Sequence, residues 1–303
     1  MSIRPVKHVM ESKPTLEGAG VKLRRAFGFG ETSDYDPFLL FDDFRNDRPD
    51  DYLAGFPWHP HRGIETITYV LAGTVEHGDS LGNRGSLGAG DIQWMTAGSG
   101  ILHQEMPQGD PTGRMHGFQL WANLPSSLKM TAPRYQDVPG KDVPEVVDDD
   151  GTRVRVVCGS FWGKKGPVEG VAADPRYLDI FVPPGQRKRL EVETSRHAFA
   201  YVFEGSGTFR DASDPRAVQT DLVGEGTTRP DFVGNRSLVL FDRGDEIVVQ
   251  AGDQGIRFLL VSGKPIEEPV AWYGPIVMNT RAELQQAYNE LNNGTFIKVA
   301  ARK

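Results

Sequence analysis

The chain has 303 residues, a formal net charge of −7 and one cysteine. The acidic charge argues against a surface that binds nucleic acid, and a single cysteine excludes a disulfide within the chain. No apolar run approaches the roughly 20 residues that cross a membrane. We therefore expect a soluble, cytoplasmic protein, or a nuclear one in a eukaryotic host, without direct contacts to nucleic acid or membrane.

The composition favours an all-β fold. The 35 glycines and 21 prolines lie well above average usage, which is typical of many tight turns between short strands. In the first part of the chain, apolar and β-branched runs bounded by turn residues predict strands at 37–44, 65–77, 90–98, 100–106 and 115–124. Dense strand signals of this kind indicate a sandwich or a barrel.

A stretch rich in Pro, Asp and Gly, from 133 to 151, is the candidate linker. Strand patterns resume after it and repeat the first part in the same order. Residues 68–77 (TYVLAGTVEH) match 200–209 (AYVFEGSGTF), and similar Gly-Asp turns lead into strands near residues 91 and 245. The sequence therefore predicts two copies of one β-unit.

We place the N-terminal domain at 1–140 and the C-terminal domain at 141–303. The second domain ends in a helix predicted over 280–293, where Thr280 and Glu283 form a capping box and Gly294 supplies the stop. This helix is expected to pack against a barrel.

Two pairs of residues in the first domain have metal-ligand chemistry, and the members of each pair are two positions apart. His59 and His61 precede a β-branched run, and His103 and Glu105 lie in a second extended segment. In a strand, residues two apart share a face, whereas on a helix they would diverge by about 200°. Imidazoles with a carboxylate suit divalent transition metals, and the absence of thiolates argues against a closed structural zinc site. The pattern predicts one metal site in the first domain.

The segments around these residues resemble known motifs. The stretch from Gly55 to Gly73 is similar to the first cupin motif, and that from Gly90 to His103 is similar to the second. FLLFDDF, HPHRGIETITYVLAG, GDIQWMTAGSGILHQEMP, HGFQLWANLPSSLKM and GPIVMNT together resemble the pirin family of the cupin superfamily, from about Arg24 to the final helix.

The resemblance implies a bicupin, in which two jelly-roll β-barrels pack face to face and only the N-terminal barrel binds metal. Its metal ligands would be His59, His61, His103 and Glu105. The metal in pirins is usually iron; the ligand types leave Mn, Ni, Co, Zn and Cu open.

The resemblance also implies a function. Some pirins are quercetin 2,3-dioxygenases, which cleave this flavonol with O₂ and release CO. We therefore expect an oxidoreductase with a small aromatic, flavonol-like substrate. Animal pirins also act as nuclear co-regulators, so the alternative is a non-enzymatic, iron-dependent regulatory protein that binds a partner protein.

Two carboxylates compete for the metal. Glu65 occupies the carboxylate position of the general cupin motif, and strand parity from His61 also directs it inward. The pirin pattern gives the role to Glu105, which we expect to bind the metal and to accept the substrate's proton as the catalytic base. Glu65 would then hydrogen-bond beside the site or in the core.

Several further residues are candidates for supporting roles. Trp94, Phe118 and the neighbouring Met95 and Trp121 would line a ligand pocket or form ordinary core, and both interpretations stay open. His116 would hydrogen-bond a metal ligand or simply pack. His77 is expected to be a solvated edge residue. His197, the only histidine of the second domain, lacks a second donor two positions away, so no metal site is expected there.

Overall fold

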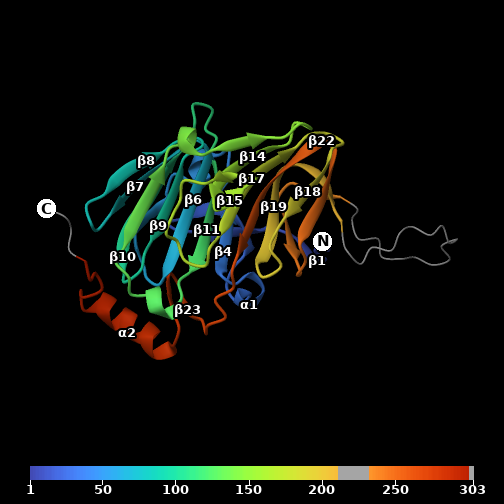
Figure 1. The fold of residues 1–303 in the computed structure, drawn as a ribbon. Coiled ribbons are helices and arrows are strands. Elements are labelled where there is room, and N and C mark those ends of the chain that lie inside the picture. The colour runs from blue at the N-terminus through green and yellow to red at the C-terminus, as the bar shows by residue number, and fades with distance from the viewer. Residues whose placement is uncertain (211–231, 300–303) are drawn as a thin grey trace, which may run out of the picture.

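The computed structural model describes residues 1–210 and 232–299. Most of these residues lie in β-strands, arranged in two large sheets, one smaller sheet and two hairpins (Figure 1). The described helices are all too short to span a membrane. The predicted all-β fold is confirmed.

The first half of the chain forms a barrel from two sheets. A seven-stranded sheet has the order β12-β9-β6-β11-β4-β3-β2, and a four-stranded sheet has the order β5-β10-β7-β8. Their strands are β2 (Lys13–Glu17), β3 (Val21–Phe27), β4 (Phe38–Asp43), β5 (Phe56–His61), β6 (Ile64–Ala72), β7 (Thr74–Asp79), β8 (Arg84–Leu87), β9 (Ile92–Thr96), β10 (Ile101–Gln108), β11 (His116–Asn123) and β12 (Arg134–Val138). Short helical turns in this half and at its end are α1 (Thr32–Tyr35), η1 (Pro49–Asp51), η2 (Ser126–Leu128) and η3 (Gly140–Asp142).

The second half forms the second barrel from one curved sheet. The strand order is β1-β21-β19-β22-β17-β14-β13, and in addition β18 pairs with β22 and β20 with β19. Its strands are β1 (Val6–Glu11), β13 (Glu145–Val147), β14 (Arg153–Cys158), β17 (Arg176–Val182), β18 (Arg187–Glu191), β19 (His197–Phe209), β20 (Val233–Gly234), β21 (Ser237–Phe241) and β22 (Glu246–Gly263). The hairpins are β15 (Ser160–Phe161) with β16 (Lys164–Lys165), and β23 (Ala271–Tyr273) with β24 (Ile276–Met278), before helix α2 (Arg281–Asn292).

The two barrels pack face to face through a buried core. Aromatic side chains of the seven-stranded sheet, such as Phe41 and Phe118, contact Phe199 and Tyr201 of the curved sheet. A separate apolar cluster fills the inside of the second barrel.

The predicted repeat corresponds to paired strands. In the first half β6 pairs with β9, and in the second half β19 pairs with β22, all antiparallel. The predicted linker at 133–151 is largely ordered, because β12 belongs to the first sheet and β13 to the second. The chain passes from one sheet to the other between Val138 and Glu145.

Two segments lie in the half opposite to their place in the sequence. Strand β1 pairs with β21 of the second half. At the other end, Val277 of β24 joins an apolar cluster with Ile64 and Ile101, so the hairpin and α2 lie against the first barrel (Figure 1). Because both segments pack across the predicted division of the chain, the domain bounds 1–140 and 141–303 stay a prediction.

The C-terminal helix begins and ends as the sequence predicts. The Thr280 side chain accepts a hydrogen bond from the Glu283 backbone N–H, and the Glu283 carboxylate accepts one from the Thr280 N–H. The predicted capping box is confirmed. Gly294, with φ 72°, follows the C-cap residue Asn293.

Candidate metal centre

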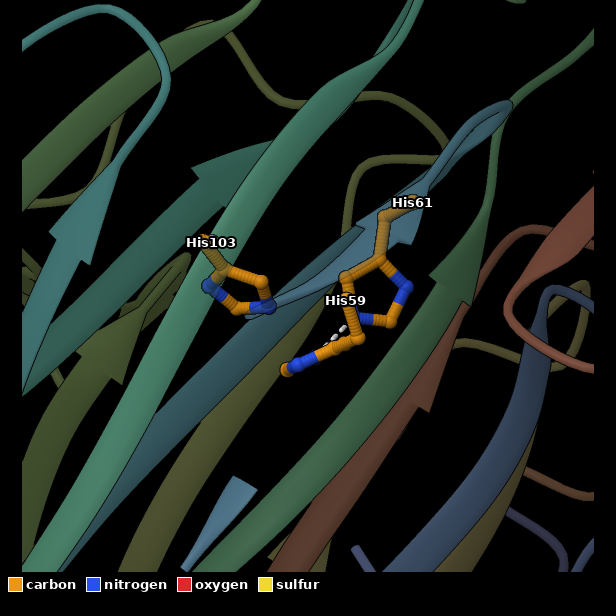
Figure 2. Close-up of side chains that lie close together, drawn as sticks. All are labelled: His59, His61 and His103. Carbon is orange, nitrogen blue, oxygen red and sulfur yellow. Dashed lines mark hydrogen bonds between the residues drawn. The ribbon is translucent and has the colours of Figure 1, made fainter. Parts of the chain in front are cut away.

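Strands β5 and β10 bring three histidines together. They run antiparallel, with His103 directly opposite His59, so the alternation of side chains places His61 on the same face. One nitrogen of each ring lies within 4.8 Å of those of the other two. Figure 2 shows the three rings converging from the two neighbouring strands. This cluster can hold a metal ion.

His59 and His61 face each other through their Nε2 atoms. In the neutral rings neither of these two atoms has a proton to donate to the other. Each ring directs Nδ1 at a carbonyl oxygen, His59 at that of Pro57 (2.9 Å) and His61 at that of Pro275 (3.2 Å). A carbonyl only accepts, so each Nδ1 carries the proton and each Nε2 a lone pair. The two Nε2 atoms lie 3.1 Å apart, along the dashed line in Figure 2. A cation between them would resolve the repulsion.

His103 supplies the second indication of an ion. Its ring is 1% exposed, and neither ring nitrogen has a hydrogen-bond partner among the described residues. Buried polar atoms without partners are rare in native proteins. Burial also lowers the pKa of His59, and lowers those of His61 and His103 well below the usual value, with the neighbouring imidazoles adding to the effect for the latter two. Neutral imidazoles are the form that binds metals.

Glu105 lies at the margin of the histidine cluster. Its Oε2 is 3.9 Å from His103 Nε2, and its Oε1 accepts a hydrogen bond of 3.2 Å from the Thr68 hydroxyl. Burial raises the pKa of Glu105 to about 7, against the opposing effect of the Thr68 hydrogen bond. The three imidazoles and this carboxylate are a donor set that fits a divalent transition metal.

A cavity of about 440 Å³ adjoins the cluster. His59, His61 and Glu105 line it, and the Trp121 ring stands edge-on to His61 with centroids 5.1 Å apart. The rest of the wall is largely apolar and aromatic: Val21, Leu23, Phe29, Leu40, Phe44, Tyr52, Phe56, Val75 and Met115. Its volume is within the range of small-molecule sites.

Charged residues also line the cavity. Arg25 donates two hydrogen bonds to Asp42, at 2.8 and 2.7 Å, and pairs with Glu17 at 2.8 Å. The guanidinium is therefore held on both sides by carboxylates. Arg25 and the acidic residues Glu17, Asp42 and Glu105 are the charged groups in the lining.

Glu65 does not join the histidines. The chain turns at Gly63, with φ 76°, and His61 and Glu65 end up in different sheets. The inward direction predicted for Glu65 by parity is therefore wrong. Its carboxylate accepts a hydrogen bond of 2.7 Å from Thr96, as expected for a group in the core.

Three of the candidate pocket residues lie elsewhere. Trp94 and Phe118 belong to the core between the barrels, and His116 packs its ring against Phe203 with centroids 5.9 Å apart. None of them lines the cavity, whereas Trp121 does. The solvated position predicted for His77 is wrong: β7 lies between β10 and β8, and the residue is 7% exposed.

Sequence reasoning missed contacts made across long separations. The Pro275 carbonyl and the pair of Arg25 with Asp42 carry no metal-ligand signature. The segment GPIVMNT, 274–280, contains Pro275 and was one of the motifs behind the family resemblance. The resemblance of this segment to the pirin family is the sequence signal that could have pointed to the role of Pro275 beside His61.

The fold and the histidine cluster define the class: two facing β-barrels with a candidate metal centre in one of them make this a two-domain cupin. Residues 20–122 match the family model described as Pirin, and residues 177–297 match the Pirin C-terminal cupin domain. The chain is 44% identical to a pirin-like protein of Caulobacter vibrioides, over 98% of this chain and 100% of the relative. It is 40% identical to a pirin-like protein of Solanum lycopersicum, over 95% and 91%. The chain belongs to the pirin family.

A solved structure of known name has the same fold. The crystal structure of quercetin 2,3-dioxygenase from Acinetobacter baumannii superposes with a TM-score of 0.84, at 30% sequence identity. The superposition covers 97% of this chain and 99% of the other. The similarity therefore extends over both barrels.

Proposed function

We propose that this protein is a metal-dependent dioxygenase of the quercetin 2,3-dioxygenase type, which cleaves a flavonol-like substrate with O₂ and releases CO. The observation that carries the proposal is the position of His59 and His61, two members of the histidine cluster, on the wall of a cavity of about 440 Å³. A closed metal site would serve structure, whereas one beside a cavity can meet a substrate. The named activity of the Acinetobacter baumannii relative supports the choice of reaction.

The proposed ligands are His59, His61, His103 and Glu105. Iron is the metal we propose first, and the same donors also accept manganese, nickel, cobalt, zinc or copper. When bound, the metal would supply Lewis acidity toward a substrate oxygen and, if redox-active, one-electron chemistry with O₂. The carbonyl groups of Pro57 and Pro275 hold two of the rings in the tautomer that presents Nε2.

The charges of the cavity favour a neutral ligand with several hydroxyl groups. Three carboxyl groups face the cavity, and the single guanidinium of Arg25 is already paired with two of them. An anionic substrate would be repelled, whereas phenolic hydroxyls can donate to these acceptors. The aromatic walls suit a flat ring system. These features support a polyphenol as the substrate.

Glu105 is positioned to move the proton. In the metal-free protein burial raises the pKa of Glu105 to about 7, so its carboxylate is a stronger base than an exposed glutamate and can accept a proton from a substrate hydroxyl. Thr68 contacts both Glu105 (3.2 Å) and the Gln119 side-chain oxygen (2.6 Å). This hydroxyl can donate to only one of them at a time, so it can adjust to the charge of Glu105.

The test is turnover by metal-loaded protein. We would follow the loss of quercetin absorbance in air, together with detection of CO, on protein loaded separately with Fe²⁺, Mn²⁺, Ni²⁺ and Co²⁺. Glu105→Gln should lose turnover, and Glu65→Gln, which alters a carboxylate in the core, is the matched control. Absence of CO with every metal would overturn the enzymatic proposal and leave the regulatory alternative.

A further inference from the structure

The C-terminal segment 271–299 contacts the tripeptide His61-Arg62-Gly63, which begins with a candidate metal ligand. The Pro275 carbonyl oxygen faces His61 Nδ1 at 3.2 Å, and the Val277 N–H donates to the Arg62 carbonyl at 3.1 Å. Residues Arg62 and Ile276 also form a parallel bridge. The hairpin of β23 and β24 therefore holds the Arg62 backbone and the His61 ring from one side.

Arg62 connects the same tripeptide to helix α2 and the residues after it. Its side chain is 2% exposed and pairs with Glu290 of α2 at 2.7 Å. It also donates to the carbonyl oxygens of Ser99 and Phe296, both at 2.8 Å, and stacks on the Phe296 ring at 4.2 Å. A buried guanidinium is stable only when its donors are paired, so Arg62 requires this segment in place.

The packing leaves no room between the tripeptide and the hairpin. Gly63 adopts φ 76°, and a Cβ built on it would lie 1.9 Å from the Val277 carbonyl oxygen. Helix α2 in turn fixes the hairpin, because the Tyr288 hydroxyl donates to the Tyr273 carbonyl at 2.8 Å. The position of the Pro275 carbonyl thus depends on how α2 docks.

We propose that the segment 271–299 is part of the metal-binding machinery: docked through Arg62 and Glu290, it orients His61, so that metal binding and docking of this segment are thermodynamically linked. Arg62 and Glu290 are positioning residues, since they act through His61. The inference rests on the metal site of the proposed function, but not on its reaction. Linkage requires that each event favour the other by the same factor.

The first arm of the test is metal affinity. Glu290→Gln removes the charge that pairs with Arg62 and keeps the shape of the side chain. We expect the dissociation constant for Co²⁺ to rise about tenfold, the usual effect of losing a group that orients a ligand, and the absorption bands of bound Co²⁺ to change. Gln285→Ala is the control, because Gln285 is exposed on the same helix and, among the described residues, its side chain hydrogen-bonds only to Asn289. Its affinity should equal that of the wild type.

The second arm measures the reverse effect on the wild-type protein, which requires no variant to fold. Co²⁺ should slow hydrogen exchange at the Val277 amide, which donates to the Arg62 carbonyl. Exchange at the Asp242 amide, which lies in the second half and donates to the Pro5 carbonyl, should stay unchanged. Equal affinity in Glu290→Gln and wild type, or no change in exchange at Val277, would overturn the inference. If the wild type binds no metal at all, the proposed function itself fails; if it binds metal but shows no linkage, only this inference fails.

Discussion

The Nε2 atoms of His59 and His61 lie 3.1 Å apart, while the Nδ1 atom of each ring faces a carbonyl oxygen. Two lone pairs at this distance repel each other, and the pKa of each ring is lowered by burial, so a proton is a poor bridge between them. A metal ion held by both nitrogens would relieve this repulsion. Metal binding should therefore raise the stability of the folded protein.

His103→Gln should abolish the stabilisation by metal. In the wild type, metal at 100 times its dissociation constant would stabilise the fold by about 2.7 kcal/mol, measured as a rise in Tm. His116→Gln is the matched control, because His116 is also buried, with no hydrogen-bond partner for Nε2 in the described part of the chain, but lies outside the cluster. A metal-dependent rise in Tm that survives in His103→Gln would contradict the proposed ligand set.

Metal affinity should increase with pH up to about 7. Burial raises the pKa of Glu105 from 4.5 to about 7, so below pH 7 the metal must displace a proton from this carboxyl group. We expect about a tenfold gain in affinity per pH unit below pH 7, measured by competition with a coloured chelator. In Glu105→Gln this dependence should flatten. A dependence unchanged in the variant would show that another group releases the proton.

The same pKa shift makes a prediction for the metal-free protein. Because the folded pKa of Glu105 lies above the value of 4.5, its neutral form is favoured in the fold. The contribution to stability is fully present below pH 4.5 and is lost as the pH rises through 7. Denaturation of metal-free wild type and Glu105→Gln at pH 4.5 and 8 should show a larger loss in the wild type, because Asp42 and Glu65, whose pKa values are also raised by burial, titrate in both proteins.

Thr68→Val should move the titration of Glu105 upward. The Thr68 hydroxyl stabilises the ionised carboxylate through its hydrogen bond, and valine keeps the shape without the donor. Losing one hydrogen bond to a charged group corresponds to about one pH unit. The midpoint of the pH dependence of metal uptake reports the shift. A midpoint at or below that of the wild type would contradict the role of Thr68.

Arg25→Met should destabilise the protein by about 3–5 kcal/mol, because it leaves the Asp42 carboxylate in the cavity wall without its partner. The double variant Arg25→Met with Asp42→Asn removes both charges and should recover part of the loss. Urea denaturation of the wild type and both variants gives the two differences. Equal stability of the single and the double variant would show that the unpaired Asp42 carboxylate does not cause the loss.

Gly63→Ala should cost more stability than Gly82→Ala. Both glycines have positive φ, so alanine pays about 1–2 kcal/mol of backbone strain at each. At Gly82 nothing lies within 4 Å of the added Cβ, whereas at Gly63 it meets the Val277 carbonyl oxygen. The additional loss in Gly63→Ala therefore measures the contact with the hairpin. Similar Tm values for the two variants would show that the hairpin moves to accommodate the added methyl group without loss of stability.

Local patterns predicted the parts of the site that lie within continuous strands. His59 with His61, and His103 with Glu105, needed only the alternation of an extended chain, and the antiparallel pairing of β5 with β10 then places His103 opposite His59. The capping box of α2 is equally local, and its residues are only three positions apart. These features depend on a few neighbouring backbone angles.

The errors arose where the chain changes direction or where distant segments meet. Parity failed for Glu65 because Gly63 turns the chain into another sheet. His77 was expected at an exposed edge, but pairing of β7 with both β10 and β8 buries it. The contact of His61 with Pro275 spans 214 positions, and no local pattern encodes it.

The exchange of segments between the halves has a consequence for modularity. A backbone cut between Val138 and Glu145 would leave fragment 1–140 without the C-terminal cover over His61, and fragment 141–303 with an open edge at β21, where β1 belongs. Each piece alone would expose surfaces prone to aggregation, whereas the two produced together would complement each other. For recombination or domain transplantation, the smallest exchangeable unit is the entire chain.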